Sequence, residues 1–379
     1  MKSVAPMTRA RRALAAVAAG AALLLVAACG SSSGGGGGSI KVAVAGPMTG
    51  SDAQYGTDFW RGASLAAADL KGKVTLEKFD DVDDSTQAAN VAQKIASDRS
   101  ISAVMGHFTT STVFATMPIY KQNEIPQLVI SASTPAITER GDKWLFRVNP
   151  PNTWGSAQVA KGLATQVKPK RIAAVYLNTD YGQADHSGFL AAAKKNGLDI
   201  VMNESYQPTT TDFTNLVLKL KQSRADAVYL SSYYNDAALI VKQAAAAGFT
   251  SHWFSGGGLY SPAYVQVGGR AVESDTWANT LPDSPQLRDV TQTYKKKYGA
   301  EPDPFVFYAY SAVRALAKAA SLKGTSRSDL RDGLAQLKDL PTPVGKLTFD
   351  GNGQFQPGQA GWVTVRSGKW VRVPNLGVS

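Results

Sequence analysis

The chain has 379 residues, of which 44% are hydrophobic and 18% are charged, a length that predicts two domains and a composition that excludes a largely disordered chain. A single cysteine excludes a disulfide scaffold or a cysteine-based zinc cluster, and the three histidines have no metal-ligand spacing. Four of the 40 basic residues lie within residues 1–28, which hold no acid, so the net charge of +11 falls to +7 beyond them. That excess is scattered along the chain, so we expect no nucleic-acid partner. We also expect no metal and no cofactor.

Residues 1–28 have the order of a secretory signal peptide. Four basic residues among the first twelve precede sixteen uncharged, mostly apolar residues, a run too short to span a bilayer comfortably. The run ends in Leu-Val-Ala-Ala before Cys29, and this pattern resembles a bacterial lipobox, in which the cysteine is lipidated after cleavage. An ordinary signal peptide followed by a chance cysteine is the alternative.

Residues 29–39 consist of Cys29 followed only by Gly and Ser. Ten such residues form a flexible coil with an r.m.s. reach of about 17 Å. We therefore expect a lipid-anchored protein in the periplasm or on the outer face of the cell membrane, with a folded body that begins at Ile40.

Short β-rich runs alternate with helical stretches along the body. The predicted strands are 40–45, 74–79, 102–106, 127–131, 171–177, 199–206 and 227–231. The predicted helices between them are 55–70, 85–98, 110–123, 181–195, 212–222 and 236–247. Such alternation predicts βαβ units and parallel sheets covered by helices on both faces, an α/β fold.

A connection at 146–153, which carries Pro and Asn, interrupts this alternation and is interpreted as the first passage between two α/β lobes. Beyond the second series we expect helices at 284–299, 304–322 and 327–338, a hairpin at 346–354 and a strand pair within 362–373. The expected domains are a signal peptide (1–28), a lipidated tether (29–39), lobe 1 (40–152 and 284–356) and lobe 2 (153–283 and 357–379).

Enzyme motifs are missing from the sequence. There is no serine nucleophile elbow, phosphate-binding loop, paired-histidine zinc motif or C-x-x-C pair. The acidic run at 80–84 lacks the central Gly and distal Glu of a calcium loop, so we expect it to end a strand and cap a helix. The sequence therefore predicts a protein that is not an enzyme.

Hydroxyl-bearing loops follow two of the predicted strands. Residues 109–112 are all Thr or Ser at a helix start, where backbone N–H groups and the helix dipole suit a carboxylate, although helix capping alone is the alternative. Residues 131–134 form the second such loop. Open α/β sheets bind small ligands at these carboxyl ends, so the two loops are expected to share one site.

Tyrosines recur at comparable places in both halves. Tyr55 lies at the start of the first helix, Tyr181 follows a strand of the second half, and Tyr233 follows the next one. A tyrosine offers an apolar face and a hydroxyl, which suits an organic ligand with polar ends. We interpret the three as walls of one cleft, with ordinary packing as the alternative.

These segments together resemble the branched-chain amino acid (Leu/Ile/Val) substrate-binding proteins of ABC importers, over nearly all of 40–373. The segments that carry the resemblance are 40–44, 53–56, 104–107, 131–134, 180–182 and 228–233. The resemblance implies a type I periplasmic-binding fold. Such a fold has two doubly wound, Rossmann-like lobes joined by three crossovers, and its cleft closes on the ligand.

The resemblance also implies roles for individual residues. Thr110, with its backbone N–H and beside Ser111, would hold the ligand carboxylate. The Ala132 carbonyl and Thr134 would contact the ligand amino group. Three tyrosines would line the cleft, namely Tyr55, Tyr181 and Tyr233.

The sequence departs from the family at Gly257, where the family usually has an Asp or Glu that pairs with the buried α-ammonium. An unpaired buried ammonium costs several kcal/mol. Either another acid takes over, for which Asp236 is a candidate besides its helix-capping role, or the ligand lacks an α-ammonium. Gly257 also leaves room for a bulkier molecule, so the expected ligand is a branched-chain amino acid-like molecule, an amide or an aromatic acid.

The resulting hypothesis is a monomeric solute-binding lipoprotein that delivers its ligand to an ABC permease. A ligand that bridges the lobes makes more contacts in the closed form than in the open form, and this difference drives closure. One alternative is a ligand-binding receptor for a membrane sensor. An exported hydrolase is the other, and it would need a nucleophile and base that the sparse histidines do not provide.

Overall fold

The computed structural model describes residues 38–273, 276–358, 360–374 and 376. Its first sheet is parallel, with the strand order β2-β1-β3-β4-β5. The strands are β1 (Ile40–Gly46), β2 (Val74–Asp80), β3 (Ala103–Met105), β4 (Gln127–Val129) and β5 (Leu145–Arg147). In β1, which lies between β2 and β3, Val42 pairs with Leu76 of β2 and with Ala103 of β3. Almost every residue of β1 is buried, as expected of a sheet covered on both faces.

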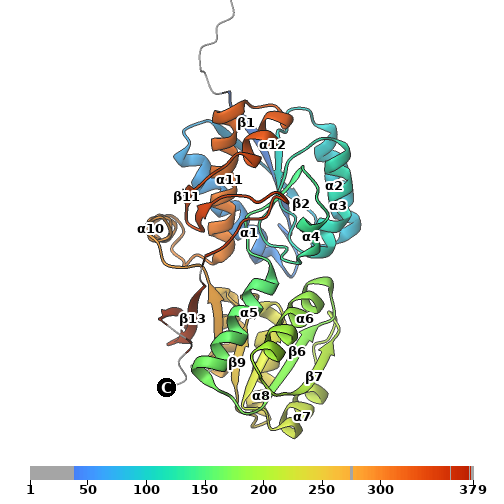
Figure 1. Ribbon diagram of the computed structural model, residues 1–379, viewed down its shortest axis with the longest axis vertical. Coiled ribbons are helices and arrows are strands. Elements are labelled where there is room, and N and C mark those ends of the chain that lie inside the picture. Colours follow the sequence, from blue (N-terminus) through green and yellow to red (C-terminus); the bar gives the residue numbers. More distant parts are fainter. Residues whose placement is uncertain (1–37, 274–275, 359, 375, 377–379) are drawn as a thin grey trace, which may run out of the picture. The chain divides into compact units, whose positions relative to one another are not determined.

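Helices from two distant parts of the chain cover the first sheet (Figure 1). Those from its own half are α1 (Ala53–Asp69), α2 (Ser85–Ser97), α3 (Thr110–Gln122) and α4 (Ala136–Glu139). Those from later in the chain are α10 (Pro285–Tyr298), α11 (Pro304–Lys323) and α12 (Arg327–Ala335). Helix α11 packs along α1, and α12 packs on α11. Each late helix begins at a side-chain cap, which is Ser284, Asp303 or Ser326.

The second sheet has the strand order β14-β13-β10-β9-β8-β6-β7. Its strands are β6 (Ile172–Leu177), β7 (Ile200–Tyr206), β8 (Ala227–Ser231), β9 (His252–Ser255), β10 (Thr276–Thr280), β13 (Gly361–Arg366) and β14 (Lys369–Val373). Strand β13 pairs antiparallel with β10 and β14 pairs antiparallel with β13, while the other pairs are parallel. Its helices are α5 (Asn152–Gly162), which continues into a π-helical turn (Leu163–Val167), α6 (Asp180–Lys195), α7 (Thr214–Ser223), α8 (Tyr234–Ala246), α9 (Pro262–Gly268) and a 3-10 turn (Gly269–Val272).

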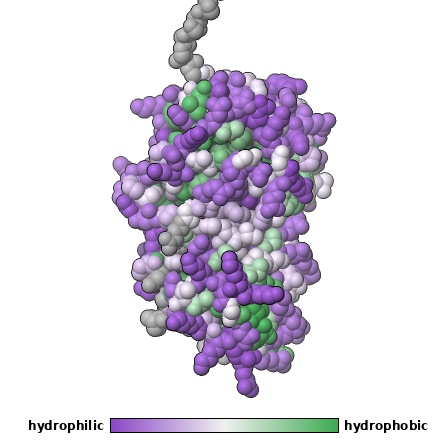
Figure 2. Space-filling model, in the orientation of Figure 1, coloured by the Kyte–Doolittle hydropathy of each residue, from purple (hydrophilic) through white to green (hydrophobic). Residues whose placement is uncertain are grey.

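Apolar side chains fill the space between sheets and helices. Val44 of β1, Phe59 of α1 and Leu316 of α11 are fully buried in one such cluster, and Phe189, Tyr229 and Phe254 are fully buried in another. The face of the molecule shown in Figure 2 is mostly hydrophilic, with apolar residues in small groups. Within the described residues, no helix combines the length and the apolar character needed to cross a bilayer.

The predicted α/β architecture is confirmed, and most predicted strands and helices lie within a few residues of the observed ones. The predicted connection at 146–153 is wrong at both ends, because β5 includes Phe146 and Arg147 and helix α5 begins at Asn152. Strand β10 and helix α5 were not anticipated. The signal peptide and the lipobox cysteine Cys29 lie outside the described residues.

The predicted hairpin at 346–354 is confirmed at its turn, where Phe349 bridges antiparallel to Phe355 and the Asp350 N–H donates to the Gln354 carbonyl at 2.9 Å. The regular hairpin joins β11 (Leu340–Thr342) to β12 (Gly345–Leu347). The segment beyond the 350–353 turn also pairs with β5, where the Arg147 N–H donates to the Gly353 carbonyl at 2.8 Å and the Phe355 N–H donates to the Arg147 carbonyl at 3.0 Å. The pairing with β5 supplies Gln354 as a partner for the buried Arg147 side chain.

Arg147 connects three parts of the fold from a fully buried position. Its Nε donates to the Gln354 side chain at 2.5 Å, its Nη1 to the Thr134 carbonyl at 2.6 Å and its Nη2 to the Thr138 hydroxyl at 3.3 Å. Burial lowers the pKa of Arg147 to about 9, so the guanidinium stays charged at neutral pH. It thereby holds the 131–134 loop against the returning C-terminal segment.

Replacing Arg147 with Met should destabilise the protein by about 3 kcal/mol, because the Gln354 side-chain oxygen would be buried without a partner and the Thr134 carbonyl would keep only the Ile137 N–H. Urea denaturation measures this change. Arg171→Met is the matched control, because the exposed Arg171 also donates to a backbone carbonyl, that of Ser223, and its loss should cost less than about 1 kcal/mol. Equal losses in the two variants would contradict the structural role given to Arg147.

Candidate functional site

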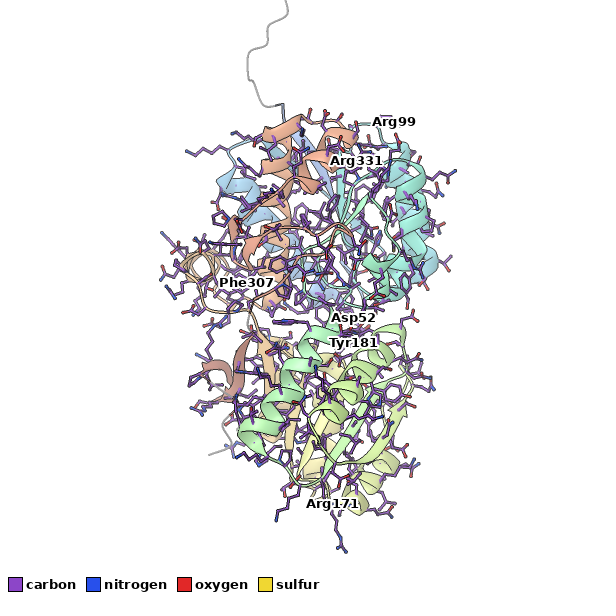
Figure 3. The ribbon with its side chains drawn as sticks, in the orientation of Figure 1. Asp52, Arg99, Arg171, Tyr181, Phe307 and Arg331 are labelled. Carbon is purple, nitrogen blue, oxygen red and sulfur yellow. The ribbon has the colours of Figure 1, made fainter. Side chains whose placement is uncertain are left out.

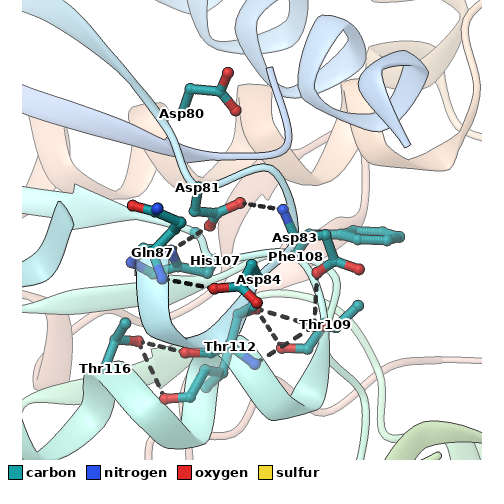
Figure 4. Close-up of polar contacts among 12 residues, drawn as sticks. Asp80, Asp81, Asp83, Asp84, Gln87, His107, Phe108, Thr109, Thr112 and Thr116 are labelled. Atoms are coloured by element: carbon teal, nitrogen blue, oxygen red, sulfur yellow. Dashed lines mark hydrogen bonds and ion pairs between the residues drawn. The ribbon is translucent and has the colours of Figure 1, made fainter. Parts of the chain in front are cut away.

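The site begins at the loop that follows β3 and leads into α3 (Figure 4). His107 is fully buried, with Nδ1 2.5 Å from the Asp81 carboxylate and Nε2 2.8 Å from the Tyr120 hydroxyl. The Thr109 hydroxyl donates to Asp83 at 2.7 Å, and the same side chain caps α3. These contacts fix the position at which α3 begins.

The acidic run between β2 and α2 has structural partners in this loop region. Asp80 accepts from the N–H and hydroxyl of Thr49, and Asp84 caps α2 through the Gln87 N–H. Among the described residues, no group of three His, Cys, Asp or Glu side chains is placed to hold a metal ion.

Thr110 is the first residue of α3 and is buried at a cavity wall. Its hydroxyl lies 3.0 Å from the Thr134 hydroxyl, and the Thr134 carbonyl accepts from Arg147. Thr134 itself does not line the cavity, so it supports Thr110 from behind. The α3 N-terminus and the Arg147 charge both favour negative charge at this end of the cavity.

The second hydroxyl loop lies next to the first, as the sequence predicted. The Ser131 hydroxyl is within hydrogen-bonding distance of the carbonyls of His107 (3.1 Å) and Phe108 (2.6 Å). The Asn149 side-chain amide donates to the carbonyl of Ser131 at 3.0 Å and approaches that of Ala132 at 3.4 Å. Ala132 lines the cavity, and so does Ser133, which sequence reasoning passed over in favour of Thr134.

Two of the three predicted tyrosines line the cavity. The rings of Tyr181 and Tyr233 stack with centroids 4.9 Å apart. Tyr55 lies outside the cavity lining and is buried against Phe108, at 4.2 Å between centroids, and against the edge of Tyr233, at 6.3 Å. Tyr55 therefore packs behind the wall that Phe108 and Tyr233 form.

The first cavity lies between the carboxyl ends of the two sheets and has a volume of about 100 Å³. This is comparable to the roughly 150 Å³ cavity that accommodates benzene in an engineered protein core. Segments from the first sheet (Phe108, Thr110, 131–133), from the second sheet (Tyr181, Asp185, Tyr233, 256–258) and from the links between the sheets (149–152, 280–282, 357–358) all line it.

A second cavity of about 350 Å³ shares Thr110, Tyr181 and Tyr233 with the first. Ser111 lines it, and the Ser111 hydroxyl donates to Asp180 at the start of α6 at 3.1 Å, a direct contact between the two halves. Asp52, which lines it too, lies close to Tyr181 in Figure 3.

Three acids line the second cavity. Burial raises the pKa of Asp83 to about 7 and that of Asp236 to about 6, and it also raises the pKa of Asp52. Asp236 was the predicted counter-charge for a ligand ammonium, but it lines this second cavity and not the first. No Lys, Arg or His of the described chain lines either cavity.

Sequence reasoning missed several polar residues of the first cavity. Asp185 lies one helical turn after Tyr181, so the i, i+4 spacing on α6 could have indicated that the two share a face. Asn152 opens helix α5, and Asn279 lies on β10, which was not predicted. Nothing in the sequence indicates that these two asparagines line the same cavity, because only the three-dimensional fold brings helix α5 and strand β10 together there.

Gly257 lines the first cavity, as expected of a cleft residue. Its φ of +120° is one that residues with side chains rarely adopt, and a Cβ there would lie 3.0 Å from the Asn279 side-chain oxygen. The position therefore disfavours an acidic side chain in this chain.

Comparisons with known proteins agree with this architecture. A family model described as periplasmic binding protein matches residues 39–368. The Leu/Ile/Val-binding protein of Escherichia coli is 29% identical over 329 residues, which covers 84% of this chain and 88% of that protein.

Two solved structures share the fold. The leucine binding protein LivK of Thermotoga maritima superposes with a TM-score of 0.83 at 24% identity, covering 89% of this chain and 99% of that one. The substrate-binding protein LivJ of Streptococcus pneumoniae, in complex with isoleucine, has a TM-score of 0.82 at 24% identity and covers 88% of this chain and 100% of that one. The resemblance seen in the sequence is confirmed, and the chain belongs to the periplasmic binding protein family, with the type I fold of two doubly wound lobes.

Proposed function

We propose that the protein is an extracytoplasmic solute-binding lipoprotein of an ABC importer, which binds an amino acid or a related small carboxylate or amide between its lobes and delivers it to the permease. The observation that carries this proposal is the first cavity, to which both sheets contribute the carboxyl ends of their strands. The family consists of binding proteins, which supports a non-enzymatic role, and its members lie outside the cytoplasm. Cys29 is the proposed lipid attachment site.

The lobes proposed for this function are 40–152 with 284–356 and 153–283 with 357–379. The packing of α11 on α1 and the addition of β13 to β10 support these boundaries. The contact between Ser111 and Asp180 links the two proposed lobes and would be lost if they moved apart. A ligand held by both lobes stabilises that closed form.

Within the cavity we propose that Thr110 and the α3 N-terminus hold the ligand carboxylate, with Thr134 orienting the Thr110 hydroxyl. Tyr181 and Tyr233 would enclose the apolar part of the ligand, and the backbone at Ala132 and Gly257 would complete the wall. The cavity volume fits one amino acid-sized molecule and not a peptide.

A binding screen tests the proposed function. Native mass spectrometry of gently purified protein should show a bound small molecule. Titration calorimetry with leucine, isoleucine, valine, phenylalanine, glutamine and benzoate should give 1:1 binding with at least one compound. An empty protein that binds none of these compounds would contradict the assignment of an amino acid-like ligand.

Tyr181→Ala and Tyr233→Ala should each weaken binding of the compound found in that screen by about tenfold to a hundredfold, because each removes a large part of the cavity wall. Tyr298→Ala, which truncates a half-buried tyrosine on α10 away from both cavities, should leave the dissociation constant within threefold. Unfolding midpoints show whether each variant folds. Unchanged affinity in both cavity variants would contradict the proposed cleft.

The second cavity predicts a pH effect on stability. The folded state raises the pKa of Asp83 to about 7 from an unfolded value near 3.9, so the proton is held more tightly when folded. The free energy of unfolding should therefore fall as the pH rises from about 4 through 7. Asp83→Asn keeps the acceptor for Thr109 and fits the positive φ of this residue, and it should stabilise the protein by at least about 1 kcal/mol more at pH 8 than at pH 5.

Urea denaturation at the two pH values measures this difference. Asp289→Asn, at an exposed carboxyl on α10, is the control and should show the same stability change at both. A pH-independent effect of Asp83→Asn would show that the Asp83 carboxyl does not titrate in this range.

A further inference from the structure

Asp185 places a carboxyl group at the wall of the first cavity, although the side chain is only 1% exposed. The Tyr229 hydroxyl donates to its Oδ2 at 2.9 Å and the Ser231 hydroxyl donates to the same oxygen at 2.6 Å. Two neutral donors on one oxygen fix the orientation of the carboxyl group and leave Oδ1 for another partner.

Gly256 leaves the approach to Asp185 open. A Cβ at residue 256 would lie 3.1 Å from Asp185 Oδ1 and 2.9 Å from the Tyr229 hydroxyl. Any side chain there would press on the carboxyl group from the cavity side. A glycine at position 256 is therefore compatible with the acid at position 185. The side chain of an acid at position 257 would instead contact Asn279.

Unpaired polar atoms surround the same cavity. Asn149 Oδ1 and Asn152 Oδ1 are buried acceptors without a hydrogen-bond partner, and Asn279 Nδ2 is a buried donor without one. The three side chains are between 3% and 6% exposed. Buried polar groups are normally paired, so these atoms indicate a ligand that offers N–H donors to the two oxygens and an acceptor to Asn279 Nδ2.

The charges around the cavity favour a cationic group. Among the described residues, Asp185 is the only ionisable acid that lines the first cavity, and no basic side chain lines it. A buried carboxylate without a cation is costly. The ligand is the one partner that has access to its open side.

We propose that Asp185 is the counter-charge for a positively charged group of the ligand, and that the ligand is accordingly a zwitterion with an ammonium group, not a simple carboxylate or aromatic acid. This proposal rests on the proposed function and specifies its substrate class. Asp185 on α6 takes the role of the acid that the family usually has at the position of Gly257. Asp236 in the second cavity does not contact the ammonium.

The test compares amino acids with their deaminated acids by titration calorimetry at pH 7.5. The pairs are leucine with 4-methylpentanoate, phenylalanine with 3-phenylpropanoate and glutamine with glutaramate. At least one amino acid should bind the wild type about 30-fold or more tightly than its deaminated partner. Asp185→Asn should weaken that amino acid about a hundredfold and change the deaminated acid less than threefold, and Asp236→Asn should change neither.

The outcomes separate the two proposals. Wild-type protein that binds a deaminated acid as tightly as its amino acid, or Asp185→Asn that keeps the affinity for the amino acid, overturns the role of Asp185 while the binding function stands. No binding of any compound to the wild type contradicts the proposed function itself.

A pH profile of the wild type decides the question if Asp185→Asn does not fold. The titratable groups that face Asp185 are Tyr181 on α6 and Tyr229 on β8, and burial keeps both as neutral phenols. Because the pKa of Asp185 is about 6, the dissociation constant of the amino acid should rise about tenfold from pH 7 to pH 5. The Asp83→Asn/Asp236→Asn double variant should keep this profile, and a flat profile in it overturns the proposal.

Discussion

The structure depends on one buried cation, the guanidinium of Arg147. Its hydrogen-bond partners are neutral oxygens on the Thr134 backbone, the Thr138 hydroxyl and the Gln354 amide, contributed by segments more than 200 residues apart in the chain. A planar fork of donors can satisfy all three at once, which a lysine could not do. Without this interaction, the loop behind Thr110 and the return of the chain to the first sheet would lose their common support.

Arg147 also contributes to a difference in charge between the two walls of the cavity. Its positive charge and the N-terminus of α3 lie behind Thr110, while the carboxyl group of Asp185 lies on the opposite lobe. A molecule with one negative and one positive end, oriented along this axis, interacts favourably with both walls. In the proposed function, closure of the lobes brings the two walls together, and the free energy of closing is then coupled to the presence of both charges on one molecule.

The sequence was sufficient for the architecture because hydrophobic periodicity and strand-end hydroxyls are local signals. Residues 109–112 and 131–134 were correctly expected to meet, since parallel strands place their carboxyl ends at one edge. Tyr55 was expected in the lining and instead packs behind it, because helix α1 directs it at Phe108. Ser133 was overlooked beside Thr134, but Ser133 lines the cavity while the Thr134 hydroxyl contacts Thr110.

Long-range pairing was the part that sequence could not provide. The segment around Gln354 has a strong turn signal and forms that turn, but nothing in it indicates its second partner, Arg147 on β5, which lies 207 residues away in the chain. Asn279 and Asp185 become neighbours of Gly256 and Gly257 only through the order of strands β10, β9 and β8. The spacing of residues along the chain does not indicate this order of strands.

The links between the lobes are themselves walls of the first cavity. Residues 149–152, 280–282 and 357–358 include four prolines, whose φ angles are fixed, so in the proposed opening of the lobes the rotation would fall on the remaining φ and ψ angles of these links. In the proposed function, a bound molecule would touch these links directly and resist their rotation. The affinity for the ligand and the rate of its release would then be set by the same atoms, and the ligand that fills this space best would be released most slowly.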